Sequence, residues 1–128
     1  MEQMTNADRK LERGMWRGKA IGTDDWTIGW RTGRCTIRDK DNNHVYRVDP
    51  STLGEWMGRY DWFEGDILES DKGYCVIIWR YEGFELEHKY KRMFEGKEAE
   101  MVSYVPLTSR GKNKVGNRWD NPTLLGGA

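Results

Sequence analysis

The sequence predicts an all-β fold, and three observations support this fold class. Apolar and polar residues alternate with a period of two in several segments, as in strands that bury one face. Fifteen glycines against three prolines favour many tight turns. Seven Trp, six Tyr and three Phe can build a small core from large rings, although 33% of the residues are charged. This aromatic content also argues against a chain that stays disordered.

The alternation predicts a β-meander in the first half of the chain. Trp26, Ile28 and Trp30 alternate with small or polar residues, so we expect their side chains to face the core. Residues 39–43 are polar and tolerate the left-handed conformation, which favours a hairpin loop. The four expected strands span residues 15–21, 26–31, 34–38 and 45–48.

Turn residues and apolar runs predict a second group of strands. Gly65 interrupts one apolar run and indicates a bend or bulge. The segment 74–81 is apolar on both faces and is therefore expected to be central. The charged segment 91–100 favours a loop or a short helix. Further strands are expected at residues 54–60, 62–69, 84–89 and 101–105, with a turn and one turn of 3₁₀ helix at 49–54.

These elements suggest a division of the chain into segments. Residues 1–13 form an N-terminal arm or short helix, with Thr5 or Asn6 as its N-cap. Residues 14–125 form the domain, with a first β unit at 14–49 and a second, SH3-like barrel-type unit at 62–106. A tail at 107–125 starts flexibly and docks through Trp119.

The net charge of zero conceals a pattern along the chain. Residues 13–47 hold eight basic residues against four acidic ones, whereas residues 48–109 hold seven against thirteen. The tail from residue 110 is basic again. Opposite charges in successive segments favour head-to-tail pairing between subunits, although surface charge also drifts over such lengths without function.

Composition excludes several classes of protein. No segment approaches the roughly 18 apolar residues of a membrane span, and the charged N-terminus is unlike a signal peptide. We therefore expect a cytoplasmic protein that does not contact membranes. Cys35 and Cys75 are expected to be reduced, buried thiols, with a disulfide as the less favoured alternative. Zero net charge argues against a protein that coats DNA non-specifically.

The sequence offers little for catalysis. His44, His88 and the two cysteines show no metal-ligand spacing, so we expect neither a metal nor a cofactor. Glu64 and Asp66 would share a face of a regular strand and could act as an acid–base pair. An Asp at such a turn more often accepts backbone hydrogen bonds, and we favour that structural role. We therefore expect no enzymatic activity and no catalytic residue.

Nucleic-acid or nucleotide binding is the alternative function that the sequence supports. Basic side chains beside tryptophans on a strand surface can bind single strands, and a basic tail would add to the attraction. The competing interpretation is that the rings face the core and the Arg stems cover it. The candidate binding face comprises Arg17, Lys19, Trp30, Arg31, Arg34 and Arg38, and the candidate basic tail comprises Arg110, Lys112 and Lys114.

Four short segments together resemble the YopX family of phage and prophage proteins. They are residues 16–19 with Trp26 and Gly29, residues 48–54, the Glu-Gly-Asp-Ile-Leu run at 64–68, and residues 116–125. They occur in family order, although the longer loop that usually precedes the Glu-Gly-Asp element is missing here. The motif residues expected to be structural are Trp16, Gly18, Gly54, Glu64, Gly65, Asp66, Trp119, Asn121 and Pro122.

The resemblance implies two small intertwined β units and self-association, and it implies no reaction. Together with the excess of Trp and Tyr, which suits an interface, it favours a phage accessory protein in the host cytoplasm. Such a protein would act by binding, as a homo-oligomer that engages or inhibits a host protein, for example a defence enzyme.

Overall fold

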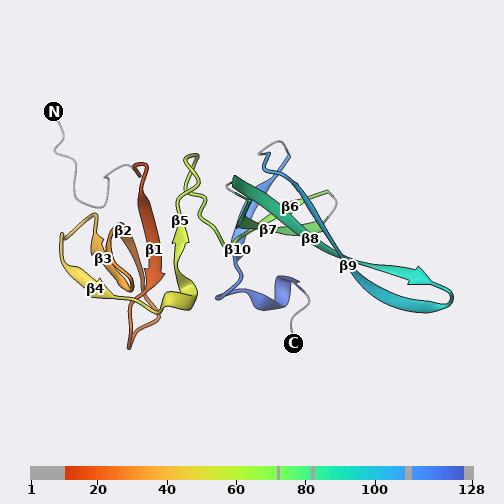
Figure 1. The fold of residues 1–128 in the computed structure, drawn as a ribbon, viewed down its shortest axis with the longest axis horizontal. Coiled ribbons are helices and arrows are strands. Elements are labelled where there is room, and N and C mark those ends of the chain that lie inside the picture. The colour runs from red at the N-terminus through yellow and green to blue at the C-terminus, as the bar shows by residue number, and fades with distance from the viewer. Residues whose placement is uncertain (1–10, 72, 82, 109–110, 126–128) are drawn as a thin grey trace. The chain divides into compact units, whose positions relative to one another are not determined.

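The computed structural model confirms the all-β class (Figure 1). It describes residues 11–71, 73–81, 83–108 and 111–125, so the expected helix in the N-terminal arm lies outside the described residues. The strands form two antiparallel five-stranded sheets. The chain divides into two compact units after Phe63, and each unit contains one sheet.

The first sheet confirms the predicted four-stranded meander and adds a short fifth strand beside the first. The fifth strand is only two residues long, where the sequence suggested residues 54–60. The strand order is β4-β3-β2-β1-β5. The strands are β1 (Met15–Lys19), β2 (Trp26–Gly33), β3 (Thr36–Asp39), β4 (Val45–Arg47) and β5 (Gly54–Glu55).

The predicted turn of 3₁₀ helix is present as η2 (Pro50–Thr52). The Asp49 carboxylate caps it by accepting hydrogen bonds from the Ser51 amide at 3.0 Å and the Ser51 hydroxyl at 2.8 Å. These bonds lower the pKa of Asp49. The Thr52 hydroxyl accepts a bond from the Lys19 amide at 2.9 Å, which fastens the turn to β1.

The buried face of β2 is the opposite of the one predicted. Thr27 and Gly29 are buried, whereas Trp26 and Trp30 are only half-buried. The reason is close backbone packing, because a Cβ on Gly29 would collide with the Arg38 carbonyl of β3. Small residues thus occupy the face that carries the fully buried Ile37, and the larger tryptophan rings are placed on the opposite face.

The second sheet has the order β10-β6-β7-β8-β9, so β7 is central as predicted. Its core consists of aliphatic side chains that are completely inaccessible, including Ile67, Leu68, Ile77 and Leu86. The strands are β6 (Asp66–Ser70), β7 (Gly73–Arg80), β8 (Gly83–Phe94), β9 (Lys97–Pro106) and β10 (Asn113–Asn117).

The prediction of a loop or helix at residues 91–100 is wrong, since the segment is the end of a β-hairpin. Glu95 and Gly96 both have positive φ, 50° and 76°, as a two-residue hairpin turn of the primed type requires. The pairing of β7 with β8 ends at Val76 opposite Glu87, whereas β8 and β9 stay paired to the turn. Residues 88–94 and 97–103 therefore form a two-stranded extension, here called the β8–β9 arm (Figure 1).

The expectation of a flexible tail is also wrong for the described part of residues 110–114. Asn113 and Lys114 belong to β10, which pairs with β6. The Lys114 ammonium lies 3.6 Å from the carboxylate of Asp66, whose side chain is 1% exposed. A buried carboxylate is stabilised by a nearby cation, so charge pairing contributes to holding the tail in the sheet.

Both sheets share one connectivity, in which four successive strands form a meander and the fifth returns beside the first. Within the described residues neither sheet takes a strand from the other unit, so the units are not intertwined by strand exchange. The tail expected at 107–125 contributes β10 to the second sheet, and β5 belongs to the first.

Gly65 joins the start of the second sheet to its closing turn. Its amide donates to the Ile77 carbonyl at 2.7 Å, and its carbonyl accepts from the Arg118 amide at 2.9 Å. Its φ is 92°, and a Cβ at this position would collide with the Trp119 ring. The position thus requires glycine both for its backbone conformation and for the ring that covers it.

Gly65→Ala is expected to destabilise the second unit by about 2–5 kcal/mol, because strain at positive φ adds to a clash with Trp119. Gly96→Ala is the matched control, since Gly96 also has positive φ but a Cβ there would meet nothing within 4 Å. It should cost only about 1–2 kcal/mol. Urea denaturation followed by tryptophan fluorescence measures both, and equal effects would contradict the role of the ring.

Candidate binding surfaces

The structure brings together only part of the predicted basic face. Arg17 and Lys19 of β1 lie on the same face of the first sheet as Trp26 and Trp30 of β2. Arg38 of β3 lies directly opposite Trp30 and joins them. Arg31 pairs with Ile37 and so lies on the other face. Arg34 lies in the turn between β2 and β3 and does not project from a strand.

The cations of this face are stacked on the protein's own aromatic rings. The Arg17 guanidinium lies 4.7 Å from the Trp26 ring centroid and 5.0 Å from that of Phe63. The Lys19 ammonium is 5.4 Å from the Trp26 ring. These contacts bury Arg17 to 6% exposure, so its guanidinium contributes to packing and is withdrawn from ligands.

The same arrangement recurs at the other tryptophans of the sheet. Arg38 lies 5.4 Å from the Trp30 centroid. On the opposite face Arg31 lies 4.7 Å from the Trp16 centroid, and its guanidinium donates to the backbone carbonyls of Gly33 and Arg34. Because each ring is already covered by a cation of the same sheet, the rings are poorly placed to stack on nucleic-acid bases.

The remaining predicted site residues have structural surroundings. Glu64 and Asp66 do not share a strand face, because Glu64 lies in a turn and β6 begins at Asp66. Of the predicted basic tail, Lys112 and Lys114 are half-buried and Arg110 lies outside the described residues.

Within the described ranges no group of three or more His, Cys, Asp or Glu could hold a metal ion. None of the helices described there is long and apolar enough to cross a membrane.

The motif residues expected to be structural lie at close backbone contacts. A Cβ on Gly18 would be 2.9 Å from Val48, and Gly54 is buried opposite Arg17. The closing turn depends on Asn117, whose carbonyl oxygen Oδ1 accepts the amides of Trp119 and Asp120 at 3.0 and 2.9 Å. The Asn117 amide donates to the side-chain oxygen Oδ1 of Asn121 at 3.2 Å, and Pro122 begins η3 (Pro122–Leu125).

The β8–β9 arm exposes large apolar side chains that the sequence analysis did not select. Met93 is 62% exposed and Phe94 is 46% exposed, and Tyr90 and Val102 are also exposed. Met93 and Phe94 were missed because residues 91–100 were not expected to be strands. The signal was present in the Glu95-Gly96 pair, since a glycine at the second position of such a pair is typical of a two-residue hairpin turn.

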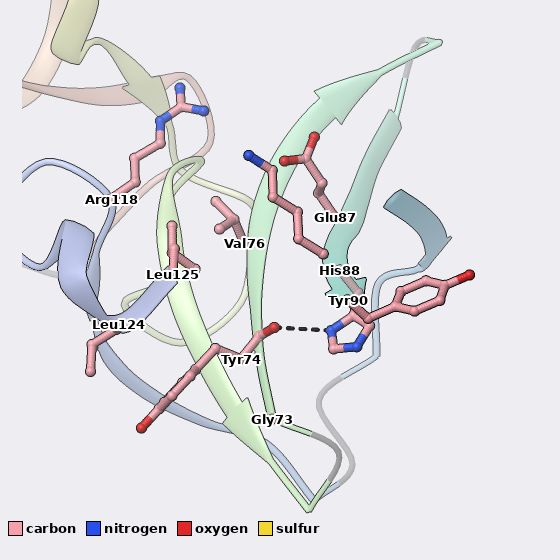
Figure 2. Close-up of a pocket in the computed structure, with 10 residues that line it drawn as sticks. Gly73, Tyr74, Val76, Glu87, His88, Tyr90, Arg118, Leu124 and Leu125 are labelled. Carbon is pink, nitrogen blue, oxygen red and sulfur yellow. Dashed lines mark hydrogen bonds between the residues drawn. The ribbon is translucent and has the colours of Figure 1, made fainter. Parts of the chain in front are cut away.

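A pocket of about 370 Å³ lies where β8 separates from β7 (Figure 2). Its apolar side is formed by Val76 of β7 with Leu124 and Leu125 of η3. At the Tyr74–His88 end, His88 Nδ1 lies 3.0 Å from the Tyr74 carbonyl oxygen and links the diverging strands. We call this pocket the β7–β8 fork.

The basic side chains of the fork are Arg118 and Lys89, and Glu87 is the acidic one. Figure 2 shows Arg118 and Glu87 toward the end opposite Tyr74 and Tyr90. Within the described part of the chain, neither Arg118 nor Lys89 forms an ion pair; Arg118 stacks on Trp119 at 4.6 Å. The fork therefore combines an apolar wall with two cations that are available to a ligand.

Comparison with known proteins gives no assignment. No protein-family model matches the sequence, and no curated protein and no solved structure matches it significantly. The YopX resemblance therefore stays a prediction that rests on its motif residues.

Arg17→Ala is expected to destabilise the first unit by about 2–4 kcal/mol, because it removes a buried stem and two cation–π contacts. Arg34→Ala removes an exposed arginine from a turn and should change the stability by less than about 0.5 kcal/mol. Thermal unfolding followed by near-UV circular dichroism compares the variants. A neutral Arg17→Ala would show that this face is not part of the packing.

The two thiols should differ in reactivity. Both cysteines are free, and Cys75 is buried whereas Cys35 is half-buried, so the prediction of two buried thiols is correct only for Cys75. Burial raises the pKa of the Cys75 thiol, which lowers its thiolate fraction at a given pH. Cys35 should therefore react with a maleimide at pH 8 at least tenfold faster than Cys75, as peptide mapping would show. The two rates should converge in urea, and equal rates in the native state would contradict this.

Proposed function

We propose that this protein is a phage or prophage accessory protein that acts by binding and not by catalysis. In this proposal it associates with itself through the β8–β9 arm and engages a host protein in the cytoplasm. The phage setting and the host target rest on the motif resemblance. The binding role is supported by the arm, which is the single observation that carries the proposal.

The arm lacks the support that a stable β structure needs. An isolated two-stranded hairpin is marginal in water, and residues 88–103 pair only within the arm in the described part of the chain. Its cross-strand pairs include Tyr90 with Met101, so apolar residues continue along it although no core covers them. Met93 and Phe94 are consecutive in β8 and so face opposite sides of the arm, and a second copy that encloses the end of the arm would remove both side chains from water.

The charges of the arm also suit association between copies. The β8 side carries Lys89, Lys91 and Arg92, whereas the β9 side carries Glu98 and Glu100. The Lys91 ammonium lies 3.7 Å from the Glu98 carboxylate, so opposite charges of the two strands already pair within one arm. Two arms can therefore approach without bringing only like charges together.

Nucleic-acid or nucleotide binding is the weaker alternative. Lys19, Trp30 and Arg38 do share one face, as that function requires. Their rings are covered by cations of the same sheet, however, and Arg17 is buried. A titration of tryptophan fluorescence with a single-stranded oligonucleotide at low salt distinguishes the two, and saturable quenching would favour the alternative.

Replacing Met93 and Phe94 by Ser should weaken self-association at least tenfold, because their burial would stabilise the assembly by about 1.5–3 kcal/mol each. Multi-angle light scattering over a concentration series measures the shift. Ile21→Ser is the control, since Ile21 is 56% exposed but belongs to the first unit. A monomer at all concentrations for the unmodified protein would refute the proposed self-association.

A further inference from the structure

We infer that the β7–β8 fork is a docking site for a short, extended acidic segment of a partner protein, which adds as a strand to the free edge of β8. The inference deepens the proposed function, since it names the chemistry of the partner, and it rests on that function only for the partner being a host protein. Three observations on the second unit carry it.

The first observation is an open strand edge. From Lys89 to Phe94, β8 pairs with β9 on one side, and within the described residues no strand pairs with the other side. All six of these residues are exposed. Alternate backbone N–H and C=O groups on such an edge can bind an incoming strand, which is the basis of strand addition.

The second observation is the match of charges. The open stretch carries Lys89, Lys91 and Arg92, and Arg118 faces the fork from the closing turn. The other edge of β8 is already occupied by a strand with Glu98 and Glu100, one of which lies 3.7 Å from Lys91. An extended segment with alternating carboxylates would repeat on the open edge the pairing that the molecule itself uses.

The third observation is the pocket in the fork. Its volume of about 370 Å³ lies within the usual range of binding sites, and it suits a few residues of one strand. Val76, Leu124 and Leu125 supply an apolar wall for one side chain of the segment. The open side of the fork lies between β8 and the residues of β7 and η3 that line the pocket. We therefore expect room there for a single chain and not for the two-stranded arm of a second copy.

The positive side chains determine which segments bind. Glu87 is the acidic group that lines the fork, and Lys89 and Arg118 outnumber it. A basic segment would meet both cations, and a proline-rich segment could not donate backbone hydrogen bonds to the edge. The preferred ligand is therefore a segment in which acidic and aliphatic residues alternate.

The test is a titration with a labelled peptide. A capped peptide of alternating glutamate and valine should raise its fluorescence anisotropy on binding the intact protein, and binding should weaken as salt is added. Matched peptides with glutamine or lysine in place of glutamate should bind at least tenfold more weakly. Equal binding of the glutamine peptide would overturn the inference.

Variants locate the site. Lys89→Glu and Arg118→Glu should each reduce binding at least tenfold, whereas Lys97→Glu, an equally exposed arm lysine on β9, should have little effect. Native-like circular dichroism would show that the variants are folded. Equal losses in all three variants would indicate general charge attraction and would overturn the fork as the site.

Light scattering separates this inference from the proposed function. Arg118 lies outside the β8–β9 arm, so Arg118→Glu should weaken peptide binding and leave the mass of the assembly unchanged. If the unmodified protein is a monomer but binds the peptide at the fork, self-association fails and the fork stands. If the peptide instead dissociates an oligomer, the fork is occupied by a second copy and the inference is wrong.

Discussion

The packing of the Trp119 ring on Gly65 is the contact on which the second unit depends. Gly65 precedes β6, and Trp119 follows β10, so the contact joins the first and last strands of one sheet beyond their ladder. The same closing turn carries Arg118 and places η3 beside β7. Both the closure of the sheet and the placement of Arg118 and η3 at the fork therefore depend on Gly65, where there is no room for a Cβ.

The two units use their charged residues differently. In the first, arginines and a lysine are stacked on tryptophans, and this converts cations into packing material around Trp26 and Trp30. In the second, Lys89 and Arg118 border an apolar wall and have no acidic partner in the described part of the chain. Basic residues are thus more numerous in the first unit's candidate face, but the cations available to a ligand lie in the second.

Period-two patterns were sufficient to predict the fold class and the first meander, and a run that is apolar on both faces predicted the central position of β7. They failed at β2, where Gly29 and its close approach to Arg38 reversed the buried face, because hydrophobicity alone does not show how near two backbones lie. They failed again at residues 91–100, where charges hid a hairpin that Glu95 and Gly96 define. The fork could not be predicted, since it arises where β8 leaves β7, a feature of register and not of composition.

The β8–β9 arm pairs with no other strand among the described residues, and a two-residue turn closes it. Insertions or deletions of two residues in each strand would keep every side chain on its present face and leave the five-stranded sheet untouched. The length of the arm can therefore change during evolution independently of the fold. Related chains could reach partners of different size with one conserved body, and arm length would be the first feature to diverge among them.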